Sequence, residues 1–136
     1  MKTPFEDEPS VRLLPQHQVE WHALRTGHIN VLVEAPVAAT RTLLVRLKPH
    51  IREPIVWKQP QESLELPSVG TGALVLEDVA GLSADEQTRL LEWLGGAGSR
   101  VQIVSTSSDP LFLRVTTGKF HSTLYYRLNV ILLRVD

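Results

Sequence analysis

The chain has 136 residues, of which 43% are apolar and 21% are charged, and it contains no cysteine. This composition is typical of one globular domain with a sizeable core, and it excludes disulfides, thiolate metal sites and a cysteine nucleophile. The net charge is −1 and no apolar run approaches the length of a membrane span, so we expect a cytoplasmic protein with no membrane contact and no general affinity for nucleic acid.

The apolar pattern predicts helices and strands in alternation. Residues 1–15 are acidic at their start and contain prolines, so we expect a flexible arm there, followed by one domain over residues 16–136. A helical pattern covers residues 16–26, and Gly27 fits a helix stop. The next segments predict a strand over 29–33, a helix over 38–47, a strand over 54–57, and a loop or single helical turn over 58–71.

The second half continues this alternation. Residues 73–76 form a wholly apolar run that predicts a strand. Ser83 and Glu86 match a capping box, which predicts that a helix begins there. The buried stripe and the end of this helix are expected at Leu90, Leu91, Leu94 and Gly95–Gly96. The remaining patterns predict a strand over 101–104, a helix over 109–117, a helical turn over 122–127 and a strand over 130–133.

Five short apolar strands separated by helices indicate an α/β fold of three layers, with a mainly parallel five-stranded sheet and helices on both faces. Sheets of this kind bind ligands beyond the carboxyl ends of their strands. The segments at those ends, residues 34–42, 77–82 and 105–110, therefore form the candidate site.

The first of these segments joins a strand to a helix, which is the setting of a phosphate-binding loop. Such a loop needs glycines that turn backbone N–H groups inward, a lysine for the phosphates and a hydroxyl for Mg²⁺. Here every glycine is missing, and Pro36 removes one N–H group. Arg41 stands at the lysine position and only Thr42 is retained. An ordinary strand–loop–helix connection is the simpler interpretation.

The other two segments carry acids and hydroxyls. Glu77 and Asp78 can hold Mg²⁺ through water and orient an attacking water, or they can lie in an exposed loop and be replaced with little loss of stability. The hydroxyls over residues 105–108 fit either a phosphate contact or a cap on the helix that follows. The five histidines lack metal-ligand spacing, so no metal site is expected, and the tryptophans are interpreted as partial core.

Several segments share their order and spacing with one family. They are residues 72–82 (GALVLEDVAGL), 87–94 (QTRLLEWL), 101–107 (VQIVSTS) and 118–130 (GKFHSTLYYRLNV). The last is the most specific, since the family reads Gly-Arg-Phe-Arg-x-Asp-Leu-Tyr-Tyr-Arg-Leu-Asn-Val there. Together they resemble the AAA+ domain of the sigma-54-dependent transcriptional activators, or bacterial enhancer-binding proteins. The resemblance implies a P-loop NTPase-like AAA+ core.

The resemblance also shows how the functional motifs have degenerated. The Walker A positions hold Ala35, Ala38, Thr40, Arg41 and Thr42, and the Walker B acids are inverted to Glu77 and Asp78. Ser107 replaces the sensor asparagine, His121 replaces the first trans-acting arginine finger, and Arg127 matches the second. The 36 positions from Arg41 to Glu77 (77 − 41 = 36) are too few for the family's sigma-54-contacting loop. We also expect no helical lid subdomain.

These losses predict that the domain does not hydrolyse ATP. The leading hypothesis is an inactive remnant of the family's core, a protein-interaction or regulatory module in bacterial transcription or signalling with no cofactor and an unidentified protein partner. One alternative is a weak binder of ATP and Mg²⁺ that still uses Thr42, Glu77–Asp78 and Arg127. Another is a module for a different ligand or nucleic acid. The interface candidates are Tyr125, Tyr126 and Arg127, in a monomer or small homo-oligomer.

Overall fold

A computed structural model describes residues 28–59, 63–67 and 71–134. The predicted arm over 1–15, the predicted helix over 16–26 and the Gly27 stop lie outside these residues. Residues 60–62 and 68–70 of the predicted loop also lie outside them, and its described residues contain no helix.

The described strands and helices follow one another in the predicted order. The elements are β1 (Val31–Glu34), α2 (Val37–Leu47), η2 (Lys48–His50), β2 (Ile55–Lys58), β3 (Ala73–Leu76), η3 (Val79–Gly81), α3 (Ala84–Leu94), β4 (Gln102–Ser107), α4 (Leu111–Thr116), α5 (Ser122–Leu128) and β5 (Ile131–Arg134). No helix among the described residues has both the length and the apolar character that crossing a bilayer requires.

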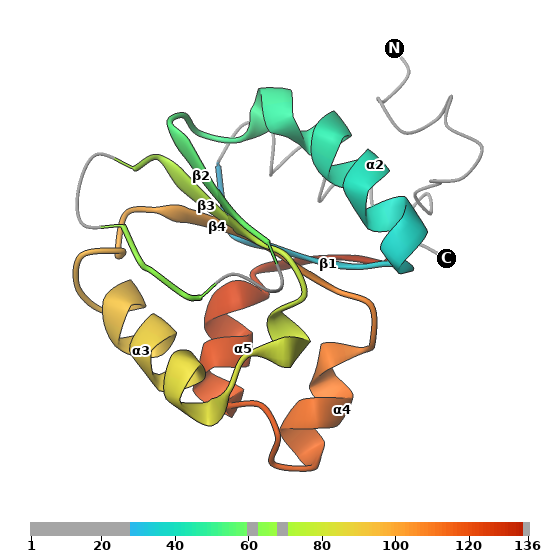
Figure 1. The fold of residues 1–136 in the computed structure, drawn as a ribbon, viewed down its shortest axis with the longest axis vertical. Helices are drawn as coiled ribbons and strands as arrows, with labels where there is room; N and C mark the ends of the chain where they lie inside the picture. Colours follow the sequence, from blue (N-terminus) through green and yellow to red (C-terminus); the bar gives the residue numbers. More distant parts are fainter. Residues whose placement is uncertain (1–27, 60–62, 68–70, 135–136) are drawn as a thin grey trace.

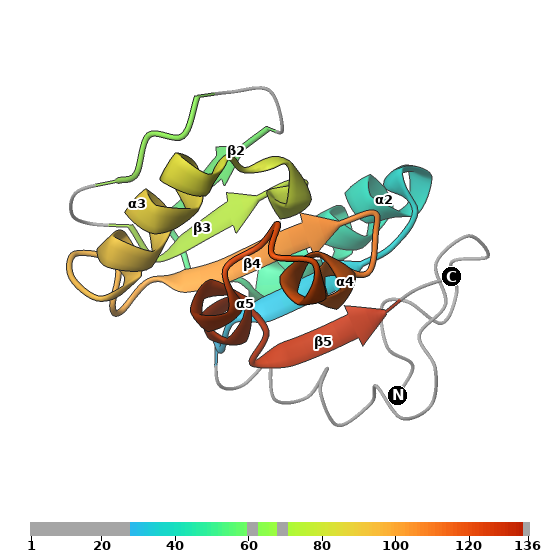
Figure 2. The ribbon, with the colours of Figure 1, turned by 90° about the horizontal axis from the view of Figure 1, so that it is seen from below.

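All neighbouring strands pair in parallel, in the order β2-β3-β4-β1-β5 (Figure 2). Helix α2 covers one face, and α3, α4 and α5 cover the other (Figure 1). The predicted three-layer α/β fold with a parallel five-stranded sheet is therefore confirmed. Parallel strands need crossover connections, and a sheet covered on both faces needs apolar side chains on both, which explains the continuous apolar runs in the sequence.

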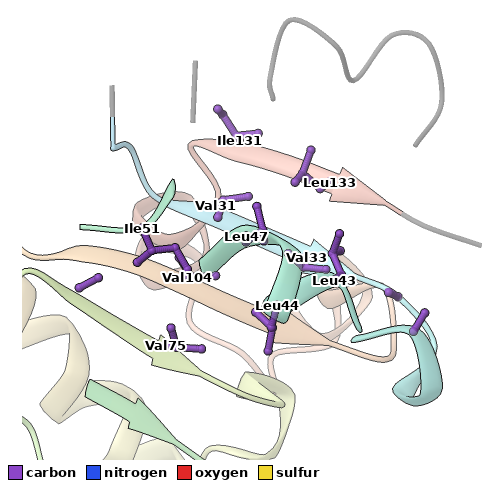
Figure 3. Close-up of a cluster of buried hydrophobic side chains, with 13 residues drawn as sticks. Val31, Val33, Leu43, Leu44, Leu47, Ile51, Val75, Val104, Ile131 and Leu133 are labelled. Carbon is purple, nitrogen blue, oxygen red and sulfur yellow. The ribbon is translucent and has the colours of Figure 1, made fainter. Parts of the chain in front are cut away.

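The core has two halves because side chains alternate between the faces of a strand. Under α2, residues of β1, β3, β4 and β5 pack against the predicted leucine stripe of that helix, and Leu43, Leu44 and Leu47 are fully buried (Figure 3). The three fall on one side of a 3.6-residue helix. On the other face, Leu32 and Ile103 pack among the apolar residues of α3, α4 and α5.

Helix α3 begins with the predicted capping box. The Glu86 N–H donates to Ser83 Oγ, and the Ser83 N–H donates to Glu86 Oε1. Its buried stripe differs from the prediction, since Leu91 is only half-buried and Gln87 is buried instead. The Gln87 amide donates to two main-chain carbonyls and accepts the His121 N–H, which satisfies a buried polar group and ties α3 to the start of α5.

Several predicted boundaries were wrong. Strand β4 continues three residues beyond the predicted end at Val104, because Ser105, Thr106 and Ser107 extend the ladder with β1. The predicted turn over 122–127 is helix α5. The predicted strands over 29–33, 54–57 and 130–133 are each shifted by one or two residues toward the carboxyl end.

Candidate functional site

The carboxyl ends of the strands frame a cavity of about 260 Å³. Its lining comes from the three segments that the sequence singled out, and comprises Val37, Thr40, Arg41, Glu77, Asp78, Thr106 and Ser108. The sequence-based expectation that these segments lie together is confirmed. Parallel β1, β3 and β4 end at the same edge of the sheet, so residues far apart in the chain converge there.

The connection from β1 to α2 is built without the open backbone of a phosphate-binding loop. The buried Ala35 donates its N–H to the Ser107 carbonyl at 3.1 Å. The Thr40 hydroxyl donates to the Pro36 carbonyl at 3.1 Å, within the first turn of α2. Ala38 is exposed, and Thr42, the one retained Walker A residue, is half-buried outside the cavity lining. These donors are therefore committed to the protein itself.

Glu77 is the most constrained polar residue of the cavity. Its side chain is only 7% exposed, and Arg41 Nε donates to its Oε1 at 3.1 Å. The indole N–H of Trp57 donates to its Oε2 at 2.6 Å. Arg41 also donates to Gln59. The interpretation of Glu77 as a freely solvated loop residue is thus wrong, because both of its carboxylate oxygens have protein partners.

Asp78 differs from its neighbour. It is exposed, and its backbone has φ +56°, the left-handed region that aspartate tolerates better than most residues. Its N–H donates to Thr106 Oγ1 at 2.9 Å, which joins the ends of β3 and β4. Asp78 therefore fits the predicted exposed strand end, and its main chain makes the structural contact.

The hydroxyls at the end of β4 point to different faces. Thr106 lines the cavity, whereas Ser107 at the sensor position is buried and its Oγ donates to the Asp109 carbonyl at 2.6 Å. The prediction that these hydroxyls cap the following helix is wrong. The N-cap residue of α4 is Pro110, and α4 has no side-chain hydrogen bond from its N-cap. Strand alternation separates Thr106 from Ser107.

Glu34 supplies the side-chain acceptor at the start of α4, and the sequence analysis did not predict it. Its side chain is 5% exposed, and its Oε2 accepts the buried Leu111 N–H at the start of α4 at 2.9 Å. Its Oε1 accepts two hydrogen bonds from Arg134, at 3.1 and 2.9 Å. The only available signal was an acid that ends an apolar strand, and both partners lie more than 70 residues away in the chain.

The two arginine-finger positions lie away from the cavity. His121 is the N-cap of α5, where its Nδ1 accepts the Thr123 N–H at 3.2 Å. Arg127 Nη2 donates to the Leu94 carbonyl at the end of α3, at 2.9 Å. Arg127 lies near the amino ends of the strands, which we call the amino edge of the sheet, so the structure does not bring it together with Glu77 and Asp78 at the carboxyl edge.

The tyrosine pair divides between core and surface. Tyr125 is buried, its ring contacts Phe112, and its hydroxyl accepts from Asn129 Nδ2 at 2.9 Å. Tyr126 is 62% exposed. Tyr125 is therefore a core residue and was wrongly grouped with the interface candidates, whereas Tyr126 has the exposure that an interface requires. Trp57 and Trp93 are half-buried, as predicted.

No three acids or histidines among the described residues converge in a way that could hold a metal ion. Glu77, the better-placed acid, already accepts from Arg41 and Trp57. A Mg²⁺ ion at Glu77 would share each carboxylate oxygen with one of these donors, because such an oxygen has two lone pairs.

Comparisons with known proteins identify a family and relatives of similar sequence. The model of the family described as Sigma-54 interaction domain matches residues 41–136. The DNA-binding transcriptional regulator NtrC of Rhizobium meliloti (strain 1021) is 37% identical over an alignment of 75 residues, and the match covers 47% of this chain and 16% of that protein. The chain thus spans about a sixth of the length of this curated relative.

Two solved structures share the fold. NtrX from Brucella abortus in complex with ATP superposes with a TM-score of 0.69 at 18% identity, over 89% of this chain and 34% of that one. The P-loop NTPase domain of the Sigma-54 transport activator from E. coli gives a TM-score of 0.58 at 15% identity, over 82% of this chain and 99% of that one. At these identities the likeness establishes the fold alone.

Proposed function

Because this chain belongs to the Sigma-54 interaction domain family, we propose that it is a catalytically inactive sigma-54 activator-type AAA+ domain, which serves a transcription regulator through protein contacts. Its activity toward ATP and its partner are the parts of this proposal that need experiment.

The observation that carries the proposal is the contact of Arg41 with Glu77. Phosphoryl transfer needs a cation that is free to bind phosphate and a carboxylate that is free to hold Mg²⁺ or orient water. Here the residue at the cation position and the first acid after β3 neutralise each other, and Trp57 holds the other oxygen of that acid. A triphosphate would have to break this pair before either group could serve it.

The backbone and the volume of the cavity support the same proposal. Pro36 has no N–H, and the Ala35 N–H is bonded to Ser107, so the connection offers few donors to phosphates. The cavity of about 260 Å³ is also smaller than the roughly 300–1,000 Å³ of clefts that bury drug-sized ligands.

Weak nucleotide binding without hydrolysis is the second candidate. It is favoured by the 62% exposure of the Arg41 side chain at the mouth of the cavity, beside the exposed Asp78. The structural relative NtrX is described in complex with ATP. This candidate requires that a nucleotide compete successfully with Glu77 for Arg41.

Calorimetry with ATP and Mg²⁺, together with a phosphate-release assay on the purified chain, separates these functions. The proposal expects neither binding heat nor turnover. Heat without turnover that is lost in Arg41→Ala would establish the second candidate. Turnover that is lost in Glu77→Ala would overturn the proposal, and Arg114→Ala is a matched control because its ion pair with Asp109 lies outside the cavity lining.

The surface proposed for protein contacts is the one around Tyr126. Phe112 and Leu113 on α4 are 44% and 60% exposed, and the Tyr125 ring contacts both Phe112 and Tyr126. Exposed aromatic groups of this kind are enriched at protein interfaces. We expect light scattering to find a monomer or small homo-oligomer, and Tyr126→Ala to weaken any dimer.

The matched control for that surface is Val45→Ala, which changes an apolar residue that is 65% exposed on α2, on the opposite face of the sheet. A dimer that is weakened equally by both substitutions would contradict the assignment to α4 and α5. A nucleotide-dependent hexamer would contradict the inactive domain itself.

A further inference from the structure

A second cleft, of about 330 Å³, opens at the opposite edge of the sheet from the cavity. Asn30, directly before β1, and Gln102, the first residue of β4, lie in its lining, which places it at the amino ends of the strands. All the strands are parallel, as their arrows in Figure 2 show, and they end at the opposite edge, where the cavity lies. The proposed function does not use this cleft.

The cleft is lined by three arginines, Arg52, Arg100 and Arg127, together with His28, and by no acidic residue. Arg52 Nη1 donates to the Arg100 carbonyl at 3.4 Å, and Arg127 Nη2 donates to the Leu94 carbonyl at 2.9 Å. These carbonyl partners occupy one N–H group each but carry no charge that could neutralise a guanidinium. Each arginine has five N–H groups, so most donors stay available.

None of these three arginines forms an ion pair within the described residues. Arg41 and Arg134, at the other end of the strands, differ in this respect because each contacts a nearly buried carboxylate. No carboxylate of the described residues compensates these three charges, so they repel each other and a bound anion would relieve that repulsion.

The main chain around the cleft is held in place by amide side chains. Gln102 Nε2 donates to the Ile29 carbonyl, and its Oε1 accepts the Arg52 N–H. Asn30 accepts the Ile103 N–H and donates to the Arg127 carbonyl. The segments that carry Arg52 and Arg127 are thus fixed before any ligand arrives, which lowers the entropy lost on binding.

The loop that carries Arg100 is fixed by packing. A Cβ atom at Gly98 would lie 2.3 Å from the Trp93 ring, so the backbone passes closer to the indole than any other residue would permit. The Gly98 N–H also donates to the Trp93 carbonyl at 2.8 Å. This close approach holds residues 98–100 against the end of α3.

We propose that this cleft binds the phosphate group of a small phosphate monoester. Guanidinium groups match the oxygens of phosphate with paired N–H donors, and a dianion compensates more of the positive charge here than a single carboxylate would. The volume is sufficient for a phosphate with a small organic group. The site is separate from the cavity at the carboxyl ends of the strands, so this inference goes beyond the proposed function.

Amide NMR of the full chain, titrated with inorganic phosphate, tests the site. We expect shifts of the backbone signals of residues 98–101, and an increase of about tenfold or more in the dissociation constant for Arg100→Ala and for Arg52→Ala. Arg114→Ala and Arg41→Ala are the controls, and both should bind phosphate as the unchanged chain does. Arg100→Glu should abolish the shifts.

Two results would overturn the proposal. One is phosphate binding that survives both Arg100→Ala and Arg52→Ala, and the other is binding that moves the signals of residues 37–41 and is lost in Arg41→Ala. The second result would point to the carboxyl edge and would count against the proposed function as well. Binding of ATP that depends on Arg100 but not on Arg41 would support the present proposal and leave the proposed function intact.

The source of the phosphate is addressed with O-phosphoserine and AMP in the same titration. Tighter Arg100-dependent binding of O-phosphoserine than of inorganic phosphate would support a phosphorylated amino acid as the ligand, and tighter binding of AMP would support a nucleotide. Weaker binding of both than of inorganic phosphate would overturn the assignment to a monoester.

Discussion

The two edges of the sheet use arginine in opposite ways. At the carboxyl edge, Arg41 and Arg134 contact Glu77 and Glu34, whose side chains are almost fully buried. At the amino edge, Arg52 and Arg127 donate only to carbonyl oxygens among the described residues. Arginine side chains therefore neutralise buried carboxylates at one edge, whereas at the other edge no carboxylate of the described residues pairs with them.

This difference bears on where a ligand can bind. Parallel α/β sheets bind ligands beyond the carboxyl ends of their strands, so the carboxyl edge would be the expected binding edge. In this chain an anion would have to displace a carboxylate there, whereas at the amino edge no carboxylate of the described residues needs to be displaced. Four substitutions test how much the charged residues at each edge contribute to stability. They are given from the largest expected loss of stability to the smallest.

Glu34→Ala should cause the largest loss, about 2–3 kcal/mol in the free energy of unfolding. The substitution leaves the buried Leu111 N–H without an acceptor and removes the ion pair with Arg134. Urea denaturation measures the loss. Arg134→Ala is the control and should cost less than about 1 kcal/mol, because Arg134 is more than half exposed. Equal losses would mean that the ion pair, rather than the Leu111 contact, stabilises this edge.

Glu77→Ala should destabilise by about 1–2 kcal/mol, since it removes the acceptor of both Trp57 and Arg41. Glu77→Gln should cost less, because an amide oxygen can still accept from the indole. Thermal denaturation and Trp57 fluorescence report the change. Asp78→Asn is the matched control and should stay within about 0.5 kcal/mol. If Glu77→Ala leaves the free energy of unfolding unchanged, the sequence-based expectation that this acid is dispensable would be correct.

Arg127→Ala should lower stability by about 1 kcal/mol, because the Leu94 carbonyl at the end of α3 loses its cationic partner. Hydrogen exchange in the last turn of α3 should rise by a corresponding factor. Arg127→Lys keeps the charge and should recover part of the loss. If exchange in α3 stays unchanged, the contact with Leu94 does not stabilise the helix.

Arg100→Ala should have the smallest effect, within about 0.5 kcal/mol, because Arg100 is exposed and its side chain forms no ion pair within the described residues. The comparison of the edges becomes sharper if this substitution raises the melting temperature, since it relieves repulsion with Arg52 and Arg127. A clear loss of stability would show that Arg100 has a structural partner and would weaken the contrast between the edges.

Local patterns predicted most of the architecture. The run over 73–76 marked β3, the spacing of Leu43, Leu44 and Leu47 marked α2, and Ser83 with Glu86 marked the start of α3. These predictions succeeded because each rests on residues within a few positions of one another. Strand ends were less predictable, since Ser105–Ser107 are polar and only their pairing with β1 makes them a strand.

The location of the candidate site was predicted from the sequence, but the contacts of its side chains were not. The rule for parallel sheets located the cavity at three strand ends, and the missing glycines were visible in the sequence. Whether Glu77 was solvated or engaged depended on Arg41 and Trp57, which lie 36 and 20 positions away. The amino-edge cleft was not predicted, because its arginines are far apart in the chain, and the one that lies in a family motif, Arg127, was interpreted only as an arginine-finger position.

The sequence by itself determined the period of each element, the order of the strands along the chain and the loss of the phosphate-binding glycines, because these depend on residue types at short spacing. Tertiary structure alone decided which charges meet. Glu34 pairs with Arg134, which is 100 residues away in the chain, whereas Arg100 pairs with no carboxylate among the described residues. Long-range pairing depends on the spatial order of the strands in the sheet and on the end of the sheet at which each side chain lies. Neither can be read from local spacing.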